Sequence, residues 1–492
     1  MVGGFARDPP SPRAACPGGR GPRRVGRGGP PGAESSAGEA SRRRVPAVPG
    51  RHGLRPRQGR PRPRREPLRR FSARQEQLSR VPASRPGRGP FRRPRGRLPP
   101  VAEREASRSL LFVEPFLDGS HAAFARGWRR HSRHRWRIVS LPGAHWKWRL
   151  RTGAFELARR LAAEPAPDAV ICTSLVDAAH LKLFAGPAGR VPWLVYWHEN
   201  QFSYPRPPGQ PLERSFAVAH LASVLAADGH GFNSRAHLEA MRAGLAAFVK
   251  EAAPPRPRGV LRHFDRAARV LPPGVELSGF PPPEPRPVGD PPAILWNHRW
   301  EEDKRPGAFA RTMLRLAEGG ASFRLILLGT TVQSRPRPLE LLREKLGDRI
   351  LRAEPARTRG SYLAWLRRAD LSVSTAAQEN FGYATVEAMA AGVVPLLPER
   401  LSYPELVGRA LAPHLLYRDE RELLARLRAL LENPQRVAAL RPAVAARARI
   451  HSWERRVVAL DDWVAGATGR GSPEGFGRAG GGIGARRGAG RR

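Results

Sequence analysis

Short apolar runs alternate with amphipathic helical segments along the middle of the chain, and this alternation constrains the fold more than any other feature. The runs have the length and the β-branched or aromatic content of strands, and the segments between them repeat apolar residues every three or four positions. Strands that alternate with helices pair in parallel, with helices covering both faces of the sheet. The sequence therefore predicts a doubly wound α/β fold.

The alternation occurs twice, before and after a Pro-rich segment. In the first series we expect strands at 109–116, 136–142, 168–174, 192–199 and 229–234, and helices at 122–132, 153–164, 215–229 and 235–249. In the second series we expect strands at 293–300, 323–330, 369–376 and 393–399, and helices at 307–320, 338–348, 383–392, 421–434 and 436–450. Two such halves joined by a hinge place a ligand in the cleft between them, at the carboxyl ends of both sheets.

The composition of the chain divides it into a core and two dissimilar ends. Residues 1–105 and 466–492 are rich in Arg, Gly and Pro and poor in aliphatic residues, so they cannot bury enough apolar surface to offset chain entropy. We therefore expect disordered ends around two Rossmann-like domains, at 106–280 and 293–465, with the Pro-rich hinge at 281–292.

The basic excess has two interpretations. The chain has 86 Lys and Arg against 43 Asp and Glu, a formal net charge of +43. An Arg-rich arm binds nucleic-acid phosphates by releasing counterions, whereas the same composition also arises when a start codon is assigned too far upstream in a GC-rich genome. The core carries its own excess of Arg over acidic residues, which would attract a polyanion without the arm.

Cysteine content and hydropathy indicate the cellular compartment of the protein. With only Cys16 and Cys172, neither a disulfide framework nor a cysteine-based zinc site can be built. No apolar run reaches the length of a membrane span, and the first residues lack the apolar stretch of a signal peptide. These features predict a cytoplasmic protein in a reducing compartment, without a membrane span.

Two glutamates stand eight positions apart across a loop-to-helix junction. In "STAAQENFGYATVEAMAAG", Glu379 falls in the loop after a predicted strand and Glu387 falls inside the next helix. Free backbone N–H groups at Asn380, Phe381, Gly382 and Tyr383 would seat an anion or sugar hydroxyls at that helix start. The two carboxylates could then take hydroxyl groups at opposite ends of an extended ligand, although two glutamates at this spacing also fit a solvated helix face.

Two further clusters follow predicted strands and would reach the same cleft. "NHRWEEDKRP" supplies Arg299 and Lys304, whose charges could neutralise a diphosphate leaving group. "YWHENQFSYP" supplies His198, Glu199 and Asn200 at the end of a strand in the first half. The alternatives are a solvated basic loop for the first cluster and a structural histidine for the second.

Together these segments resemble glycosyltransferase family 4-like enzymes of the GT-B fold, in which Glu379 and Glu387 match an E-x7-E motif. The strings "LLFVEPFLDGSH", "YWHENQFSYP", "GFNSRAHLEAM", "LWNHRWEEDKRP" and "ENFGYATVEAMAAGVVPLLPERLSYPEL" look like the signature segments of the tRNA-queuosine α-mannosyltransferase family. They occur in order and cover the core from Ser109 to the "HSWERRVVALDDWV" segment. HENQ and WNHRWE are far more specific than the E-x7-E pair.

The resemblance implies a retaining transfer of mannose from GDP-mannose to queuosine in tRNA. It implies that Glu387 holds the donor ribose, that Glu379 with Asn380, Phe381, Gly382 and Tyr383 orients the donor sugar, and that Arg299 and Lys304 stabilise the departing diphosphate. His198 would lie near the sugar, and Gly119, Ser120 and His121, with Glu199 and Asn200, would form the acceptor side. No metal, cofactor or covalent nucleophile is required, and the oligomeric state is not predicted.

Two other functions remain open at this point. One keeps the fold and uses another nucleotide sugar with a small-molecule or lipid-linked acceptor. The other is a non-catalytic RNA-binding protein whose basic arm does the binding.

Overall fold

The computed structural model describes residues 107–206, 209–280, 290–330 and 336–469. All of them belong to one compact unit of the chain. The predicted disordered ends, apart from residues 466–469 at the end of the last helix, and most of the predicted hinge lie outside the described residues.

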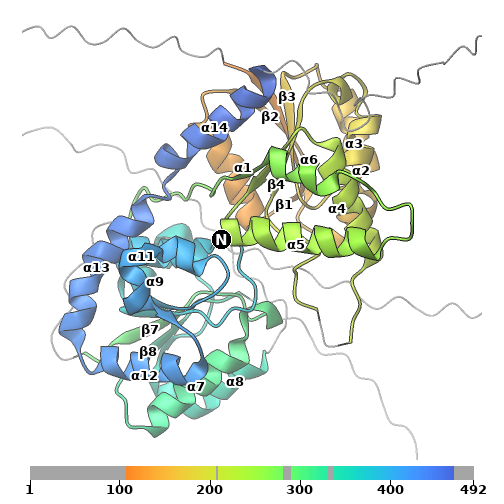
Figure 1. The fold of residues 1–492 in the computed structure, drawn as a ribbon. Helices are drawn as coiled ribbons and strands as arrows, with labels where there is room; N and C mark the ends of the chain where they lie inside the picture. Colours follow the sequence, from red (N-terminus) through yellow and green to blue (C-terminus); the bar gives the residue numbers. More distant parts are fainter. Residues whose placement is uncertain (1–106, 207–208, 281–289, 331–335, 470–492) are drawn as a thin grey trace, which may run out of the picture. The chain divides into compact units, whose positions relative to one another are not determined.

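The first half contains a parallel six-stranded sheet with the order β2-β1-β3-β4-β5-β6 (Figure 1). Its strands are β1 (Ser109–Leu117), β2 (Arg135–Pro142), β3 (Ala169–Thr173), β4 (Trp193–Trp197), β5 (Gly229–Phe232) and β6 (Ala268–Val270). Its helices are α1 (Gly119–His131), α2 (Trp146–Ala162), α3 (Ala178–Phe184), α4 (Arg214–Ala226), α5 (Arg235–Glu251) and α6 (Val260–Ala267), with a 3-10 turn η1 (Gly186–Arg190).

The second half repeats this plan with the strand order β12-β11-β10-β7-β8-β9, again parallel. Its strands are β7 (Ala293–Trp296), β8 (Arg324–Leu327), β9 (Ile350–Arg352), β10 (Leu371–Val373), β11 (Val394–Pro398) and β12 (Leu416–Tyr417). Its helices are α7 (Pro306–Glu318), α8 (Arg337–Leu346), α9 (Arg359–Arg367), α10 (Tyr383–Ala390), α11 (Tyr403–Leu415), α12 (Glu420–Leu431), α13 (Pro434–Arg449) and α14 (Trp453–Gly469), with 3-10 turns η2 (Glu302–Lys304) and η3 (Gly347–Arg349).

Burial on both faces explains why the strands are continuous apolar runs. Every residue of β3 and β4 is buried, as expected for central strands of a parallel sheet covered by helices. The apolar residues of the two sheets belong to separate clusters, so each half has its own core. The two doubly wound α/β halves expected from the sequence are thereby confirmed.

The last helix, α14, returns to the first half and packs beside α1 (Figure 1). Trp453 lies against Gly127 and Gly274 so closely that a Cβ at either glycine would stand 2.2 Å from the indole ring. This packing differs from the sequence-based division, which assigns the helix to the 293–465 domain. The helix also continues to Gly469, into the segment that we expected to be disordered from residue 466.

Several elements are absent from the sequence prediction because local pattern does not mark them. Helix α11 carries Pro404, Pro413 and a kink at Gly408, where φ is 73°, and these residues suggest a loop. Helix α2 starts at Trp146 rather than near Gly153, which lies inside the helix. Among the described residues, no helix combines the length and apolar character needed to cross a membrane.

Candidate active site

One cavity of about 220 Å³ is lined by residues of both halves. The predicted site residues that line it are Ser120, His121, His198, Glu199, Arg299, Lys304, Glu379, Asn380, Phe381, Tyr383 and Glu387. The structure therefore brings together eleven side chains that lie as much as 267 positions apart in sequence. Gly119, Asn200 and Gly382 were also predicted but do not line the cavity, and each has a local role instead.

The local roles of these three residues are clear from their contacts. Gly119 begins α1 with φ 51°, and its N–H donates to Asp118 Oδ1 at 2.7 Å. Asn200 is buried, and its side-chain oxygen accepts from Ser203 N at 2.9 Å. Gly382 starts α10 with φ 102°, a left-handed conformation that residues with a Cβ rarely adopt. They shape the loops that carry the cavity residues.

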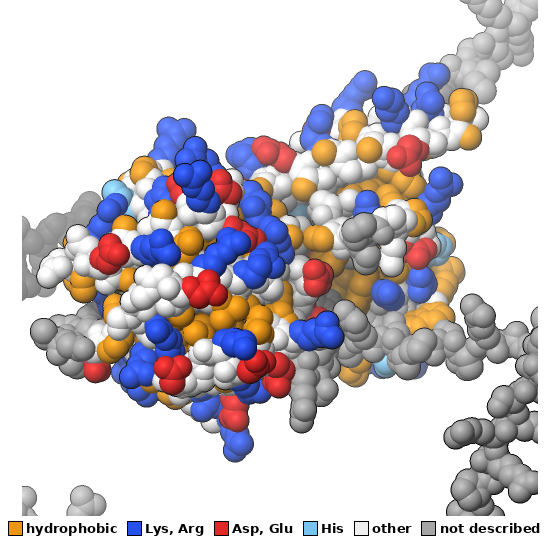
Figure 2. All heavy atoms as spheres, turned by 90° about the horizontal axis from the view of Figure 1, so that it is seen from below, with side chains coloured by type: hydrophobic (Ala, Val, Ile, Leu, Met, Phe, Trp, Pro, Cys, Tyr) orange, Lys and Arg blue, Asp and Glu red, His pale blue; other side chains and the backbone are white. Residues whose placement is uncertain are grey.

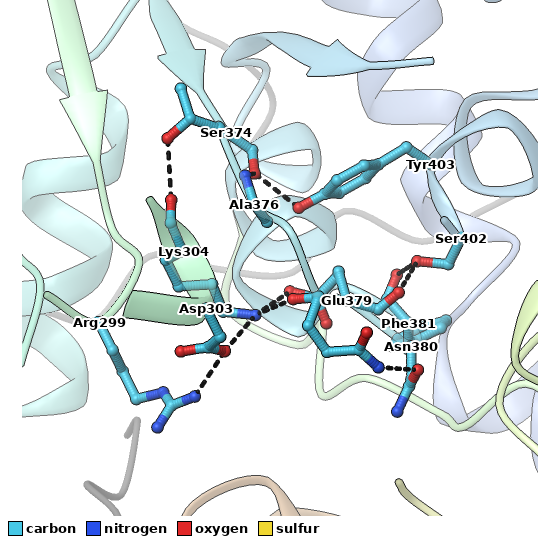
Figure 3. Close-up of polar contacts among 12 residues, drawn as sticks. Arg299, Asp303, Lys304, Ser374, Ala376, Glu379, Asn380, Phe381, Ser402 and Tyr403 are labelled. Carbon is cyan, nitrogen blue, oxygen red and sulfur yellow. Dashed lines mark hydrogen bonds and ion pairs between the residues drawn. The ribbon is translucent and has the colours of Figure 1, made fainter. Parts of the chain in front are cut away.

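The two predicted cations converge on one carboxylate oxygen (Figure 3). Arg299 Nη2 lies 3.0 Å from Asp303 Oδ2, and Lys304 Nζ lies 3.4 Å from the same oxygen. Lys304 also lies 3.2 Å from Glu379 Oε2 and donates to the Gln378 carbonyl at 2.6 Å. Burial disfavours the charge on Arg299, but Asp303 and Tyr204 raise its pKa above the ordinary value. Arg299 is thus held charged at the cavity wall, with Lys304 beside it.

Hydrogen bonds brace the two loops that carry these groups. The Asp303 carbonyl accepts from Ala377 N at 2.8 Å and from Gln378 N at 3.2 Å, and Thr375 Oγ1 donates to the Lys304 carbonyl at 2.8 Å. The loops follow β7 and β10, which are neighbours in the sheet. On the other side, Ser402 Oγ bonds to the Glu379 carbonyl at 3.2 Å (Figure 3). The backbone, and not only side-chain charge, therefore fixes the position of Glu379 relative to Lys304.

The start of α10 lies at the cavity. No side chain caps this helix, and its first residues, Tyr383 and Ala384, line the cavity. Glu387, one turn further on, forms an ion pair with Arg359 at the start of α9. Asn297 fixes the same region by donating to the Ala384 carbonyl at 2.9 Å. The second glutamate of the motif therefore lies at the cavity wall with a cation beside it.

On the first-half side, His121 lies between two carboxylates. Its Nδ1 is 3.0 Å from Glu114 Oε1 and its Nε2 is 3.2 Å from Glu199 Oε2. Although burial disfavours the charged imidazolium, Glu114 and Glu199 raise the pKa of His121 to about 10. His121 is therefore a buried cation at the start of α1, held by one carboxylate from β1 and one from the loop after β4.

His198 packs against this cation but is itself neutral. Its ring centroid is 4.3 Å from that of His121. Burial and the charge of His121 lower the pKa of His198 well below its ordinary value, so the ring is neutral. Its Nε2 is buried without a hydrogen-bond partner among the described residues, while its carbonyl accepts from Asn380 Nδ2 at 2.9 Å across the cleft. A neutral imidazole with an unused nitrogen thus lines the cavity.

Glu114, His121 and His198 also have side-chain ligand atoms within 4.8 Å of one another, a spacing that suits a metal ion. Both ring nitrogens of His121 are already paired with carboxylates, and its raised pKa keeps them protonated. A metal ion would have to displace that proton. The donor set as it stands is a charged hydrogen-bond network, so we derive no chemistry through a metal.

Sequence reasoning did not identify several cavity residues, although some lie in the quoted strings. These are Ala123, Tyr204, Asn233, Asn297, His298, Asp303, Gln378 and Ala384. Arg359 and Glu114, which hold two of the predicted residues, were also not identified. Glu114 did carry a signal, since a carboxylate in the middle of the apolar run "LLFVEPF" must find partners inside the protein.

Comparison with known proteins matches each half to a family. Residues 109–275 match the model for the N-terminal part of tRNA-queuosine alpha-mannosyltransferase, and residues 291–433 match the model for group 1 glycosyl transferases. The tRNA-queuosine alpha-mannosyltransferase of Drosophila melanogaster is 28% identical over 309 residues, which is 60% of this chain and 81% of the fly protein. The chain thus resembles the tRNA-queuosine alpha-mannosyltransferases. It is a glycosyltransferase.

More distant relatives share parts of the chain or its fold. A D-inositol 3-phosphate glycosyltransferase of Xylanimonas cellulosilytica is 31% identical over 223 residues, covering 41% of this chain and 52% of that protein. Sucrose-phosphate synthase from Thermosynechococcus elongatus superimposes with a TM-score of 0.56 at 16% identity, covering 73% of this chain and 99% of its own. The catalytic domain of starch synthase IV from Arabidopsis thaliana gives a TM-score of 0.56 at 11% identity, covering 74% and 100%. The chain has the GT-B fold.

Proposed function

We propose that this chain transfers mannose from GDP-mannose to queuosine in tRNA, with retention of configuration at the anomeric carbon. The observation that carries the proposal is a family match in the first half, which would supply the acceptor side of the cavity. Residues 109–275 match the model for the N-terminal part of tRNA-queuosine alpha-mannosyltransferase. The second half matches a broad group of glycosyl transferases, in agreement with a general nucleotide-sugar site.

The geometry of the second half supports a site for the donor diphosphate. Arg299 and Lys304 are both held toward the cavity by Asp303, so an entering diphosphate meets two cations that are already in place. As the bond from the sugar to the phosphate breaks, negative charge grows on the phosphate oxygens. Cations fixed beforehand in a partly dry site stabilise that charge without reorganisation, which is commonly a dominant catalytic effect.

The two glutamates of the motif would hold the rest of the donor. Glu379, fixed by Lys304 and by its backbone, would accept hydrogen bonds from the sugar hydroxyls. Glu387 would accept from the ribose diol, and Arg359 would then either share its carboxylate or move aside. The N–H groups at the start of α10 lie between these two carboxylates in sequence and would face the phosphates or the sugar.

The first half would position the acceptor and the sugar. His198 is neutral and offers its Nε2 to a sugar or acceptor hydroxyl, and His121 holds Glu199 in the adjacent wall. In the reaction, the bond between the anomeric carbon and the phosphate oxygen breaks and a bond to the acceptor oxygen forms on the same face. The proton of the acceptor hydroxyl passes to the departing phosphate oxygen, so no side chain has to act as a covalent nucleophile.

A transfer assay with the full chain tests the proposal. The chain is given radiolabelled GDP-mannose or GDP-glucose, with tRNA that contains or lacks queuosine. We expect label only in queuosine-bearing tRNA and only from GDP-mannose, and we expect an α-specific mannosidase to release it. Label in tRNA that lacks queuosine, or resistance to the α-specific enzyme, contradicts the acceptor or the stereochemistry respectively. A tRNA acceptor would place the enzyme in the cytoplasm.

A second function keeps the fold and changes the acceptor. The similarity to the D-inositol 3-phosphate glycosyltransferase covers 41% of this chain and favours a small phosphorylated alcohol as the alternative acceptor class. In the same assay, donor hydrolysis without labelled tRNA, together with a labelled low-molecular-weight product, would support this alternative and exclude the first proposal.

A further inference from the structure

The stretch "HWKWRLR" at the start of α2 interleaves aromatic and basic residues and takes no part in the cavity described above. It lies inside a long segment without acidic residues, since no Asp or Glu occurs from Gly119 through Phe155. By contrast, Figure 2 shows a face of the molecule on which basic and acidic side chains are interspersed. We call Trp146, Lys147, Trp148 and Arg151 the basic–aromatic patch.

The basic–aromatic patch lies close to the acceptor side of the cavity. Strand β2 runs parallel to β1, with Pro142 paired to Leu117, so the loops that follow both strands leave the same edge of the sheet. Gly143 packs against Asp118, where a Cβ would stand 2.2 Å from the aspartate Cβ. Asp118 directly precedes the first turn of α1, whose Ser120 lines the cavity.

The patch has one anchored aromatic ring and one exposed ring. Trp146 packs on Phe216 of α4 with a centroid separation of 5.6 Å, and the Arg151 guanidinium lies 4.8 Å from the same Phe216 ring. Trp148 is 55% exposed, with the Arg151 guanidinium 5.9 Å from its ring centroid. An indole left in water contributes little to the core.

The charge of the patch remains positive after its contacts are counted. Lys147 is exposed, with its ammonium 5.8 Å from the Trp146 ring. Arg151 has a carboxylate neighbour in Glu213, at 3.4 Å, and that side chain is itself 51% exposed. An ion pair this exposed is weak and yields readily to a phosphate.

We propose that the basic–aromatic patch binds single-stranded RNA beside the acceptor nucleotide, with Trp148 stacking on an unpaired base and Lys147 and Arg151 contacting phosphates. Every base offers a flat face to an aromatic ring, and basic side chains around the ring follow the backbone, so the pattern suits an RNA loop. The inference rests on the proposed tRNA acceptor and adds the surface that holds the nucleotides flanking the modified one.

Binding of the full chain to a queuosine-bearing anticodon stem-loop, followed by fluorescence anisotropy without donor, tests the patch. Trp148→Ala should weaken RNA binding by about tenfold, since stacking on one aromatic ring is lost. Phe155→Ala is the matched control, because Phe155 lies on the same helix, is 54% exposed and faces Phe184 rather than cations. It should bind RNA as the wild type does, and GDP affinity should be unchanged in both variants, which also shows that they fold.

Salt dependence and steady-state kinetics provide two further readouts. Lys147→Gln should reduce the slope of log affinity against log salt by about one, as expected for the loss of one phosphate contact. Trp148→Ala should raise KM for tRNA and leave kcat at saturating tRNA nearly unchanged. Equal RNA affinity for Trp148→Ala, Phe155→Ala and the wild type overturns the inference.

The remaining outcomes separate this inference from the proposed function. If the wild type glycosylates tRNA and Trp148→Ala binds and glycosylates RNA equally well, the RNA-binding role of the patch is rejected and the proposed function stands. If the wild type neither binds the stem-loop nor labels tRNA, the proposed function itself fails. If Trp148→Ala loses binding to anionic lipid vesicles but not to RNA, the patch is a membrane-binding surface and the inference is overturned.

Discussion

At the scale of single residues, the central feature of the site is the pairing of Arg299 and Lys304 with Asp303 Oδ2. Replacing either cation by Ala should lower kcat by about 10²–10³, because one fixed positive charge is lost where the leaving diphosphate develops charge. Arg311→Ala is the control, since this arginine is 53% exposed and pairs with Glu420 on the surface. Steady-state kinetics of variants whose thermal stability equals that of the wild type would check this prediction. Near-normal rates in both the Arg299 and the Lys304 variant would contradict the diphosphate role.

The charge states of the two adjacent histidines, His121 and His198, predict a flat pH–rate profile. The pKa of His121 is raised to about 10 and that of His198 is lowered well below 6.5, so neither changes protonation between about pH 6.5 and 9. We expect kcat/KM to show no histidine inflection in that range. An inflection near pH 6.5 that disappears in His198→Gln would contradict the assignment.

The raised pKa of His121 also has a consequence for stability. A group whose folded pKa lies above its unfolded value stabilises the fold fully below the unfolded pKa, here about 6.5. That contribution is lost as the pH rises through about 10. The network of Glu114, His121 and Glu199 therefore supports the first half at neutral pH and weakens in strong alkali.

The sequence indicated most of these residues but not their partners. Glu379, Arg299, Lys304 and His198 lie at or just after the ends of predicted strands, and the carboxyl ends of parallel strands point toward one cleft. Arg359 pairs with Glu387 from a helix 28 positions away, and no local pattern encodes such a contact. Asp303 pairs with Arg299 and Lys304 within its own segment, but its acidic neighbours in "WEEDK" do not distinguish it. Gly119 and Gly382, predicted on the acceptor and donor sides, have positive φ angles and carry the neighbouring cavity residues.

At the scale of secondary-structure elements, helix α14 provides the clearest structural test. Asp461 is buried and accepts from Trp128 Nε1, Ser132 Oγ and Arg133 N, each at 2.8 Å. Asp461→Ala should lower the free energy of unfolding by about 2–4 kcal/mol, because three donors lose their acceptor inside the protein. Urea denaturation measures the loss.

The adjacent residue supplies the control for this test. Asp462 is 58% exposed and forms a surface ion pair with Arg133 at 2.9 Å, so Asp462→Ala should change the free energy of unfolding by less than about 1 kcal/mol. Equal effects of the two substitutions would show that α14 does not depend on the Asp461 contacts.

The strands were easier to predict than the partners of the helices. Apolar runs such as "AVICT" and "WLVYW" mark buried parallel strands directly, and the sheet follows from their alternation with helices. The sequence of α14 indicates an amphipathic helix, but the surface that covers its apolar face lies more than 300 positions away, around Trp128. Helix α11 was not predicted because Pro404 and Gly408 interrupt its pattern.

At the scale of the whole molecule, two α/β halves of similar plan enclose one cavity, and each supplies a different kind of chemistry. The second half provides fixed cations and carboxylates, which suit the proposed nucleotide sugar, and the first half provides a neutral histidine beside a buried charged network. Contacts between the halves, such as Asn380 Nδ2 to the His198 carbonyl and Glu405 to the N–H groups of Arg235 and Ala236, hold the two sides together.

The identity of the modified nucleoside tests the central claim most directly. Queuosine-bearing tRNA is incubated with the full chain and GDP-mannose, digested to nucleosides and analysed by liquid chromatography with mass spectrometry. We predict that queuosine is converted to a hexosylated queuosine by the wild type and far more slowly by Lys304→Ala. Unchanged queuosine with GDP released at the wild-type rate, or a hexose on a different nucleoside, would contradict the account.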